Sequence, residues 1–108
     1  MNVILYGTKK CADTRKAERF FRERKIPFQM RDIGEKPVAE GELKNLVAGR
    51  SAADLVDTGS KQYIKRGLAF MEYDAFEELL DDSALLVTPI IRIDRKVFVR
   101  PVLEELPL

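Results

Sequence analysis

The first 33 residues change hydrophobic period twice, and this change constrains the fold more than any other feature of the chain. Residues 2–7 form a short apolar run, residues 12–25 repeat apolar side chains at helical spacing, and residues 28–33 alternate apolar with polar side chains. Pro27 pushes the residue before it out of the helical region and so ends the helix. A strand, a helix and a strand joined by short turns predict a βαβ unit with two parallel strands.

The rest of the chain predicts a helical middle followed by a hairpin. From about residue 37 to residue 82 the sequence shows helical signals only. Residues 90–99 form two apolar strands around a tight turn, which predicts an antiparallel hairpin. Residues 101–106 predict a short final helix that begins with proline. A chain of 108 residues is expected to form one α/β domain, with a helical insertion at about residues 37–82.

The composition excludes several classes of function. Nineteen basic and eighteen acidic residues leave a net charge of only +1, so we expect no nucleic-acid partner and no membrane surface. One cysteine excludes an intrachain disulfide, and without histidine we expect no metal site. No apolar run reaches membrane-spanning length, and the chain enters a strand directly rather than a signal peptide. We therefore expect a cytoplasmic monomer with a free thiol.

The single cysteine, Cys11, lies at the predicted turn between the first strand and the first helix. Unpaired N–H groups and the positive end of the helix dipole favour a thiolate there, and Lys10 and Arg15 add positive charge. Thr14 has two interpretations: its hydroxyl donates to the sulfur, or it is an ordinary first-turn threonine. Asp13 opposes ionisation of the thiol. This context predicts a nucleophilic cysteine, and the alternative is a buried cysteine that only fills space.

Several short blocks of sequence carry a resemblance to a known family. The specific blocks are Leu5 to Gly7 with Lys10 to Ala17, and Thr88 to Ile91, and Val99 to Pro101 also matches. With them the chain resembles the arsenate reductase-like family, the relatives of glutaredoxin that include the Spx-type regulators. The resemblance implies a thioredoxin-like fold (βαβ, helical insertion, ββα) with a four-stranded mixed sheet. It also implies that the peptide bond between Thr88 and Pro89 is cis. Cys11 is then expected to attack an oxyanion substrate or to form a mixed disulfide with glutathione.

The chain departs from the oxyanion site of this family. Arsenate reductases of this type surround the cysteine with three arginines, of which one matches Arg100. Thr88 stands in place of the second arginine, and acidic Asp57 lies near the position of the third, where Lys61 can compensate in part. Each charge-assisted hydrogen bond contributes about 1.5–3 kcal/mol. We therefore do not expect efficient arsenate reduction.

Two functions follow from this resemblance. The first is a glutathione-dependent thiol oxidoreductase, in which Cys11 is the nucleophile and no cofactor stays bound. Four residues are then expected to bind the small oxyanion or the glutathione: Arg100, Thr88, Pro89 and Lys61. The second is a non-enzymatic Spx-type regulator that docks on a protein partner such as RNA polymerase. Because Thr14 occupies the position of the second cysteine in a Cys-x-x-Cys switch, an intrachain redox switch is excluded.

Overall fold

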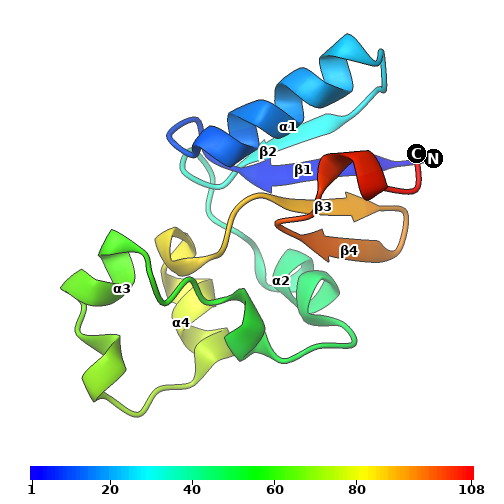
Figure 1. Ribbon diagram of the computed structural model, residues 1–108. Helices are drawn as coiled ribbons and strands as arrows, with labels where there is room; N and C mark the ends of the chain where they lie inside the picture. Colours follow the sequence, from blue (N-terminus) through cyan, green and yellow to red (C-terminus); the bar gives the residue numbers. More distant parts are fainter. The chain divides into compact units, whose positions relative to one another are not determined.

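Four strands form one mixed sheet (Figure 1). In the computed structural model, which describes residues 1–108, the strands are β1 (Val3–Gly7), β2 (Gln29–Asp32), β3 (Ile90–Ile93) and β4 (Lys96–Val99). Their order across the sheet is β2-β1-β3-β4. β1 is parallel to β2 and antiparallel to β3, and β3 forms an antiparallel hairpin with β4. The predicted parallel pair, the predicted hairpin and the thioredoxin-like α/β fold are thereby confirmed.

The first helix, α1 (Ala12–Glu23), covers one face of this sheet with its apolar side. Ala17 and Phe21 are completely buried in a core that they share with Leu5 of β1 and Ile91 of β3. The helix ends before Pro27, as the sequence predicts. Burial of these side chains holds the helix against the sheet, and its first turn stays at the carboxyl end of β1.

Gly7, the last residue of β1, allows the first turn of α1 to lie directly against the strand. A Cβ atom at this position would lie 2.3 Å from Oγ1 of Thr14, far inside van der Waals contact. Thr14 is completely buried in this position. The absence of a side chain on Gly7 therefore fixes the start of the helix, and with it the position of Cys11.

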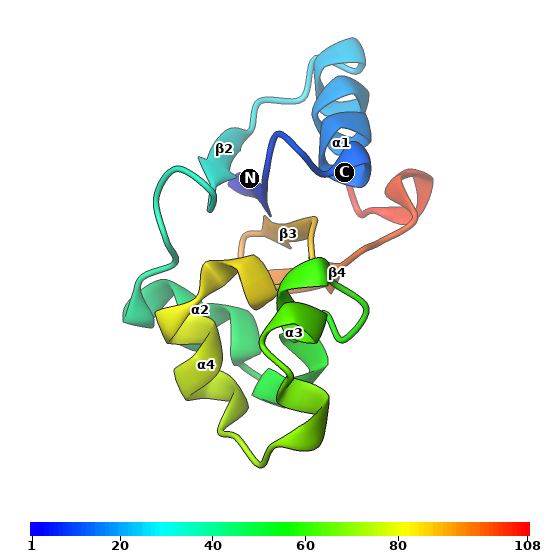
Figure 2. The ribbon, with the colours of Figure 1, turned by 90° about the vertical axis from the view of Figure 1, so that its left-hand side faces the viewer.

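Residues 37–87 form a second compact unit, and residues 1–36 with 88–108 form the first. The helical elements of the second unit are α2 (Glu40–Val47), η1 (Ala52–Leu55), α3 (Lys61–Lys65), η2 (Leu68–Phe70), α4 (Ala75–Asp81) and η3 (Ser83–Leu85). One isolated antiparallel bridge joins Val56 to Leu86. Within this unit, α4 packs against α2 and η1 (Figure 2). The guanidinium of Arg66 binds the carboxylates of Glu78 and Asp82. The stretch is helical, as the sequence predicts, and the single domain expected from the chain length stays a prediction.

The helix predicted for residues 101–106 is wrong. Only one 3₁₀ turn, η4 (Leu103–Glu105), forms there. Pro107 disfavours the helical region at Leu106, which is extended, so the segment is too short to propagate an α-helix. No helix in the chain combines the length and the apolar character that crossing a bilayer requires.

Candidate active site

Cys11 is the residue immediately before α1, and it is half-buried. Its N–H group donates to the carbonyl of Thr8 over 3.2 Å, and its carbonyl accepts from the N–H of Arg15 over 3.1 Å. The Cys11 side chain forms no cap on the helix. The main chain is thus anchored on both sides, while the sulfur stays available for contacts outside the helix.

The thiol of Cys11 points to a cis peptide bond. Its Sγ donates to the carbonyl oxygen of Thr88 at 3.8 Å, and the Thr88–Pro89 bond is cis, which confirms the isomer implied by the resemblance. The same oxygen accepts a hydrogen bond from Nε of Arg100 at 3.0 Å, and the N–H of Arg100 donates to the carbonyl of Pro89 at 3.0 Å. One carbonyl oxygen therefore joins the thiol to the guanidinium group.

Arg100 reaches this position from an unusual backbone conformation. It directly follows β4 and has a φ of 46°, in the left-handed region that side chains other than glycine rarely occupy. The two hydrogen bonds to the Thr88–Pro89 segment hold it there. Arg100 is thus the one predicted anion-binding side chain whose charge lies beside the carbonyl that the thiol contacts.

The environment of Cys11 favours the thiolate. Burial raises the pKa of the thiol, but the Thr14 hydroxyl, the Thr88 side chain and the backbone N–H groups of Thr14 and Asp13 hydrogen-bond the sulfur and lower the pKa below its ordinary value. Thr14 is completely buried, and its hydroxyl has no hydrogen-bond partner apart from this sulfur. Since an ionised sulfur accepts a hydrogen bond more strongly than a neutral thiol does, this buried donor favours the thiolate.

The cations near the thiol have other contacts. Nη1 of Arg15 donates to the carbonyl of Lys9 at 2.6 Å, and the ammonium group of Lys9 pairs with Glu35 at 3.0 Å. Lys10 is exposed. The contacts that lower the pKa of Cys11 are all hydrogen bonds, so the supporting roles predicted for Lys10 and Arg15 stay predictions.

Lys61 and Asp57 belong to the second unit. Lys61 is exposed at the first position of α3, and the N–H of Asp57 donates to the carbonyl of Leu85 at 2.8 Å. The contribution of Lys61 to an anion site stays a prediction based on the sequence.

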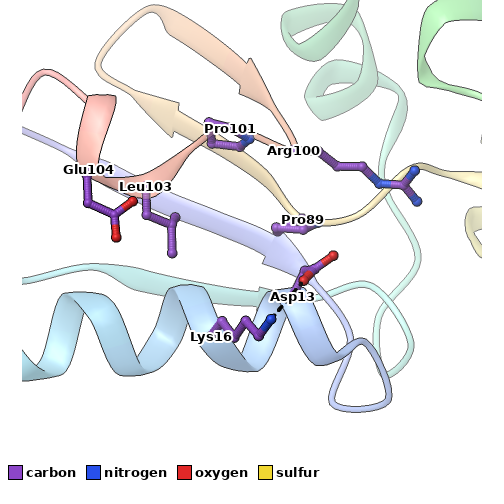
Figure 3. A pocket seen from close by; sticks show the side chains of 7 residues that line it. All are labelled: Asp13, Lys16, Pro89, Arg100, Pro101, Leu103 and Glu104. Atoms are coloured by element: carbon purple, nitrogen blue, oxygen red, sulfur yellow. Dashed lines mark ion pairs between the residues drawn. The ribbon is translucent and has the colours of Figure 1, made fainter.

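A pocket of about 340 Å³ opens beside Pro89, between the start of α1 and the segment that follows β4 (Figure 3). Its lining consists of Asp13, Lys16, Pro89, Arg100, Pro101, Leu103 and Glu104. The sequence predicts Pro89 and Arg100 as binding residues but not Lys16 or Glu104. The i, i+3 spacing of Asp13 and Lys16 on one helix predicts their ion pair. No pattern in the neighbouring sequence predicts that Glu104 lines the same pocket as these two residues of α1.

The first half of the chain is similar to glutaredoxins, because residues 3–53 match the glutaredoxin family model. Solved structures share the fold over nearly the whole chain. A protein from Yersinia pestis, described as a proposed arsenate reductase, has a TM-score of 0.78 and 22% identity, and the alignment covers 91% of this chain and 91% of that chain. The arsenate reductase from Vibrio cholerae has a TM-score of 0.75 and 20% identity, with 90% and 87% covered.

An arsenate reductase-related protein from Brucella melitensis is similar to the same extent, with a TM-score of 0.71, 19% identity, and 92% and 86% of the two chains covered. Among curated proteins, none matches this sequence significantly. The resemblance identified from the sequence is therefore confirmed at the level of the fold: the chain has an arsenate reductase-like thioredoxin fold.

Proposed function

We propose that this protein is a glutathione-dependent thiol oxidoreductase whose nucleophile is Cys11. The observation that carries the proposal is the environment of the sulfur. It lies at the start of α1, contacts the carbonyl of the cis Thr88–Pro89 segment, and has a pKa that hydrogen bonds lower despite burial. A lowered pKa raises the thiolate fraction at neutral pH, and the thiolate is the attacking species. The match of residues 3–53 to glutaredoxins supports the same chemistry.

The proposed reaction is two successive thiol–disulfide exchanges. The Cys11 thiolate attacks the glutathione sulfur of a mixed disulfide, which forms a Cys11–glutathione disulfide and breaks the substrate S–S bond. The substrate leaves as a thiolate and takes a proton from water. A second glutathione thiolate then attacks the glutathione sulfur of the adduct and releases Cys11 as thiolate, together with oxidised glutathione. The cycle needs no bound cofactor, because glutathione supplies both electrons.

We propose that the guanidinium group of Arg100 binds the anionic end of glutathione or of another small thiol. Its guanidinium is held next to the sulfur through the Thr88 carbonyl. Thr88 presents an oxygen acceptor to the sulfur and cannot replace an arginine as a cationic donor. A doubly charged oxyanion such as arsenate is therefore a weaker candidate substrate than a peptide with a single carboxylate near the thiol. We place this chemistry in a reducing cytoplasm, and we propose that the protein acts as a monomer.

Mass spectrometry of the intact protein tests the proposal. After exposure to oxidised glutathione, we expect one glutathione adduct on the wild-type protein and none on Cys11→Ser. Addition of reduced glutathione should remove the adduct. A thiol that forms no adduct, or an adduct that glutathione does not remove, contradicts the proposal.

A docking role on a protein such as RNA polymerase is the second candidate. It is favoured by three exposed apolar side chains within residues 64–71, of which Phe70 is 93% exposed. Ile64 and Met71 are the other two. Exposed aromatic and aliphatic side chains that follow closely in the sequence are typical of interaction surfaces. Binding to purified RNA polymerase that Phe70→Ser abolishes, together with an unreactive thiol, would favour this role over the enzymatic one.

A further inference from the structure

The net charge of +1 is the sum of two units with opposite charge. Residues 1–36 and 88–108 contain fourteen basic and eight acidic side chains, a net charge of +6. Residues 37–87 contain five basic and ten acidic side chains, a net charge of −5. Exposed charges more than about 8 Å apart are largely screened at physiological salt. A partner that approaches Cys11 therefore responds to the charges near this residue rather than to the net charge of the chain.

Most of the excess positive charge of the first unit lies in and around α1. Residues 9–25 contain eight basic and three acidic side chains. Arg15, Arg19 and Arg22 follow Cys11 by four, eight and eleven residues, a spacing that places them along one side of the helix, and all three are exposed. At about 1.5 Å per residue, they lie about 6, 12 and 16 Å from Cys11 along the helix axis. We call these three residues the arginine row.

The charges of the arginine row are only partly neutralised. Arg15 donates to a neutral backbone carbonyl at 2.6 Å, and Arg19 has neither an ion pair nor a side-chain hydrogen bond. Arg22 pairs with Glu18 at 2.8 Å. Of the acidic side chains in α1, only Glu23, in the last turn, has no ion pair. The two arginines of the row that lie nearest the thiol are therefore the ones without a counter-ion.

The chemistry at the start of the row decides which kind of anion fits it. A membrane surface requires apolar side chains to insert, but the apolar side of α1 is buried in the core against the sheet. Nucleic acid offers phosphates but no sulfur for the thiolate at the end of the row. A polypeptide with a disulfide at one residue and carboxylates on its neighbours complements both the nucleophile and the arginines.

We propose that the arginine row binds an acidic stretch of a polypeptide substrate whose cysteine carries glutathione. The inference rests on the proposed function of Cys11 and adds the class of its substrate. The Cys11 thiolate attacks the glutathione sulfur, a Cys11–glutathione disulfide forms, the S–S bond to the polypeptide breaks, and the polypeptide leaves as a thiolate that takes a proton from water. At about 3.3 Å per residue of extended chain, carboxylates about two, four and five residues from the reacting cysteine lie opposite Arg15, Arg19 and Arg22.

Three glutathionylated peptides of equal length test the inference. Each contains one cysteine, and the second, fourth and fifth residues on both sides of it are aspartate, asparagine or lysine. Release of the peptide by the reduced protein is followed by mass spectrometry, and each rate is divided by the rate of 2-mercaptoethanol with the same peptide. We expect the normalised rate to be highest for the aspartate peptide and lowest for the lysine peptide, and high salt to reduce the difference. Equal normalised rates overturn the inference.

The variant Arg19→Gln tests the row itself. It should lower the ratio of aspartate-peptide to asparagine-peptide rates by about twofold, because a single exposed ion pair contributes little. Arg95→Gln is the matched control: Arg95 is exposed, has no ion pair, and lies in the turn between β3 and β4, beside the amino end of β1 rather than the carboxyl end that leads to Cys11. The ratio should keep its wild-type value there. Equal losses in both variants would assign the preference to the net charge of the unit and overturn the inference.

Nucleic acid is the competing occupant of the row. We expect no binding of oligothymidylate to the wild-type protein at physiological salt. Binding that Arg19→Gln weakens and Arg95→Gln leaves unchanged would assign the row to nucleic acid and overturn the inference, with the nucleophile still in place. A wild-type protein that reacts with none of the three peptides contradicts the proposed function itself.

Discussion

At the scale of single residues, the hydroxyl of Thr14 is the group that most directly links burial to reactivity. It is completely buried and has no hydrogen-bond partner apart from the Cys11 sulfur. An unsatisfied buried hydroxyl destabilises the folded protein. A thiolate accepts from this hydroxyl more strongly than a neutral thiol does, so the hydroxyl favours the ionised form of Cys11.

The variant Thr14→Val tests this role with little change in shape. We expect the pKa of Cys11 to rise, because one donor to the thiolate is lost, and alkylation at neutral pH to slow severalfold. Thr14→Ser, which keeps the hydroxyl, should restore the reactivity. The pH dependence of the iodoacetamide reaction measures both effects. An unchanged midpoint in Thr14→Val would show that the hydroxyl has no part in thiolate formation.

The lowered pKa of Cys11 also predicts how stability changes with pH. The folded-state pKa lies below that of the unfolded chain, which is about 8.5. The thiolate therefore contributes stability that is fully present above the unfolded pKa and is lost as pH falls through the folded pKa. Urea unfolding under reducing conditions should show wild type gaining stability relative to Cys11→Ser as the pH rises through this window. A relative loss would mean that burial dominates the pKa.

At the scale of elements, the contact between Gly7 and the first turn of α1 sets the site. The sequence alone could predict both elements, because their hydrophobic periods are distinct. It could also predict Cys11 at the turn between them. The close approach at Gly7 could not be predicted in this way, because it depends on packing between residues of two elements rather than on a local pattern.

The variant Gly7→Ala is expected to displace the start of α1, because its Cβ atom would lie 2.3 Å from Oγ1 of Thr14. Overpacking of this kind costs about 1–3 kcal/mol in the free energy of unfolding. Gly41→Ala is the matched control: nothing lies within 4 Å of a Cβ atom there, and the residue is in α2. That change should stabilise the protein by about 0.5–1 kcal/mol. Urea unfolding measures both, and equal effects would contradict the packing argument.

The wrong helix prediction and the missed Glu104 both concern the chain after β4. Residues 101–106 carry helical signals, yet Pro107 leaves room for only one 3₁₀ turn before it. Because this turn forms one wall of the pocket, Glu104 was missed as a site residue. The role of Arg100 and the cis isomer of the Thr88–Pro89 bond are predicted only through the resemblance to a family. Local sequence alone does not predict the cis isomer, because only a small fraction of X–Pro bonds in folded proteins are cis.

At the scale of the whole molecule, the chain divides its tasks between two compact units. Every hydrogen-bond partner of the Cys11 sulfur lies in residues 1–36 and 88–108. The unit of residues 37–87 has its own polar network, in which Arg66 joins α3 to Glu78 and Asp82 of the α4 region. Stability of the second unit and reactivity of the thiol are therefore expected to be separable.

The variant Arg66→Gln tests this separation. Loss of the guanidinium leaves Glu78 and Asp82 without their shared cation, so the midpoint of urea unfolding should fall. The alkylation midpoint of Cys11 should stay unchanged. Lys44→Gln, which removes an exposed ion pair with Glu40 on α2, should have a much smaller effect on unfolding. A shift in the thiol midpoint with Arg66→Gln would show that the two units are coupled.

The left-handed backbone conformation of Arg100 affects which residues evolution can place at this position. Glycine at this position would relieve a left-handed conformation that costs of order 1 kcal/mol, but it would remove the guanidinium that contacts the Thr88 carbonyl. At position 100, selection for stability therefore favours glycine, whereas selection for activity favours arginine. A protein that kept the fold but no longer needed the guanidinium would be expected to accept glycine here.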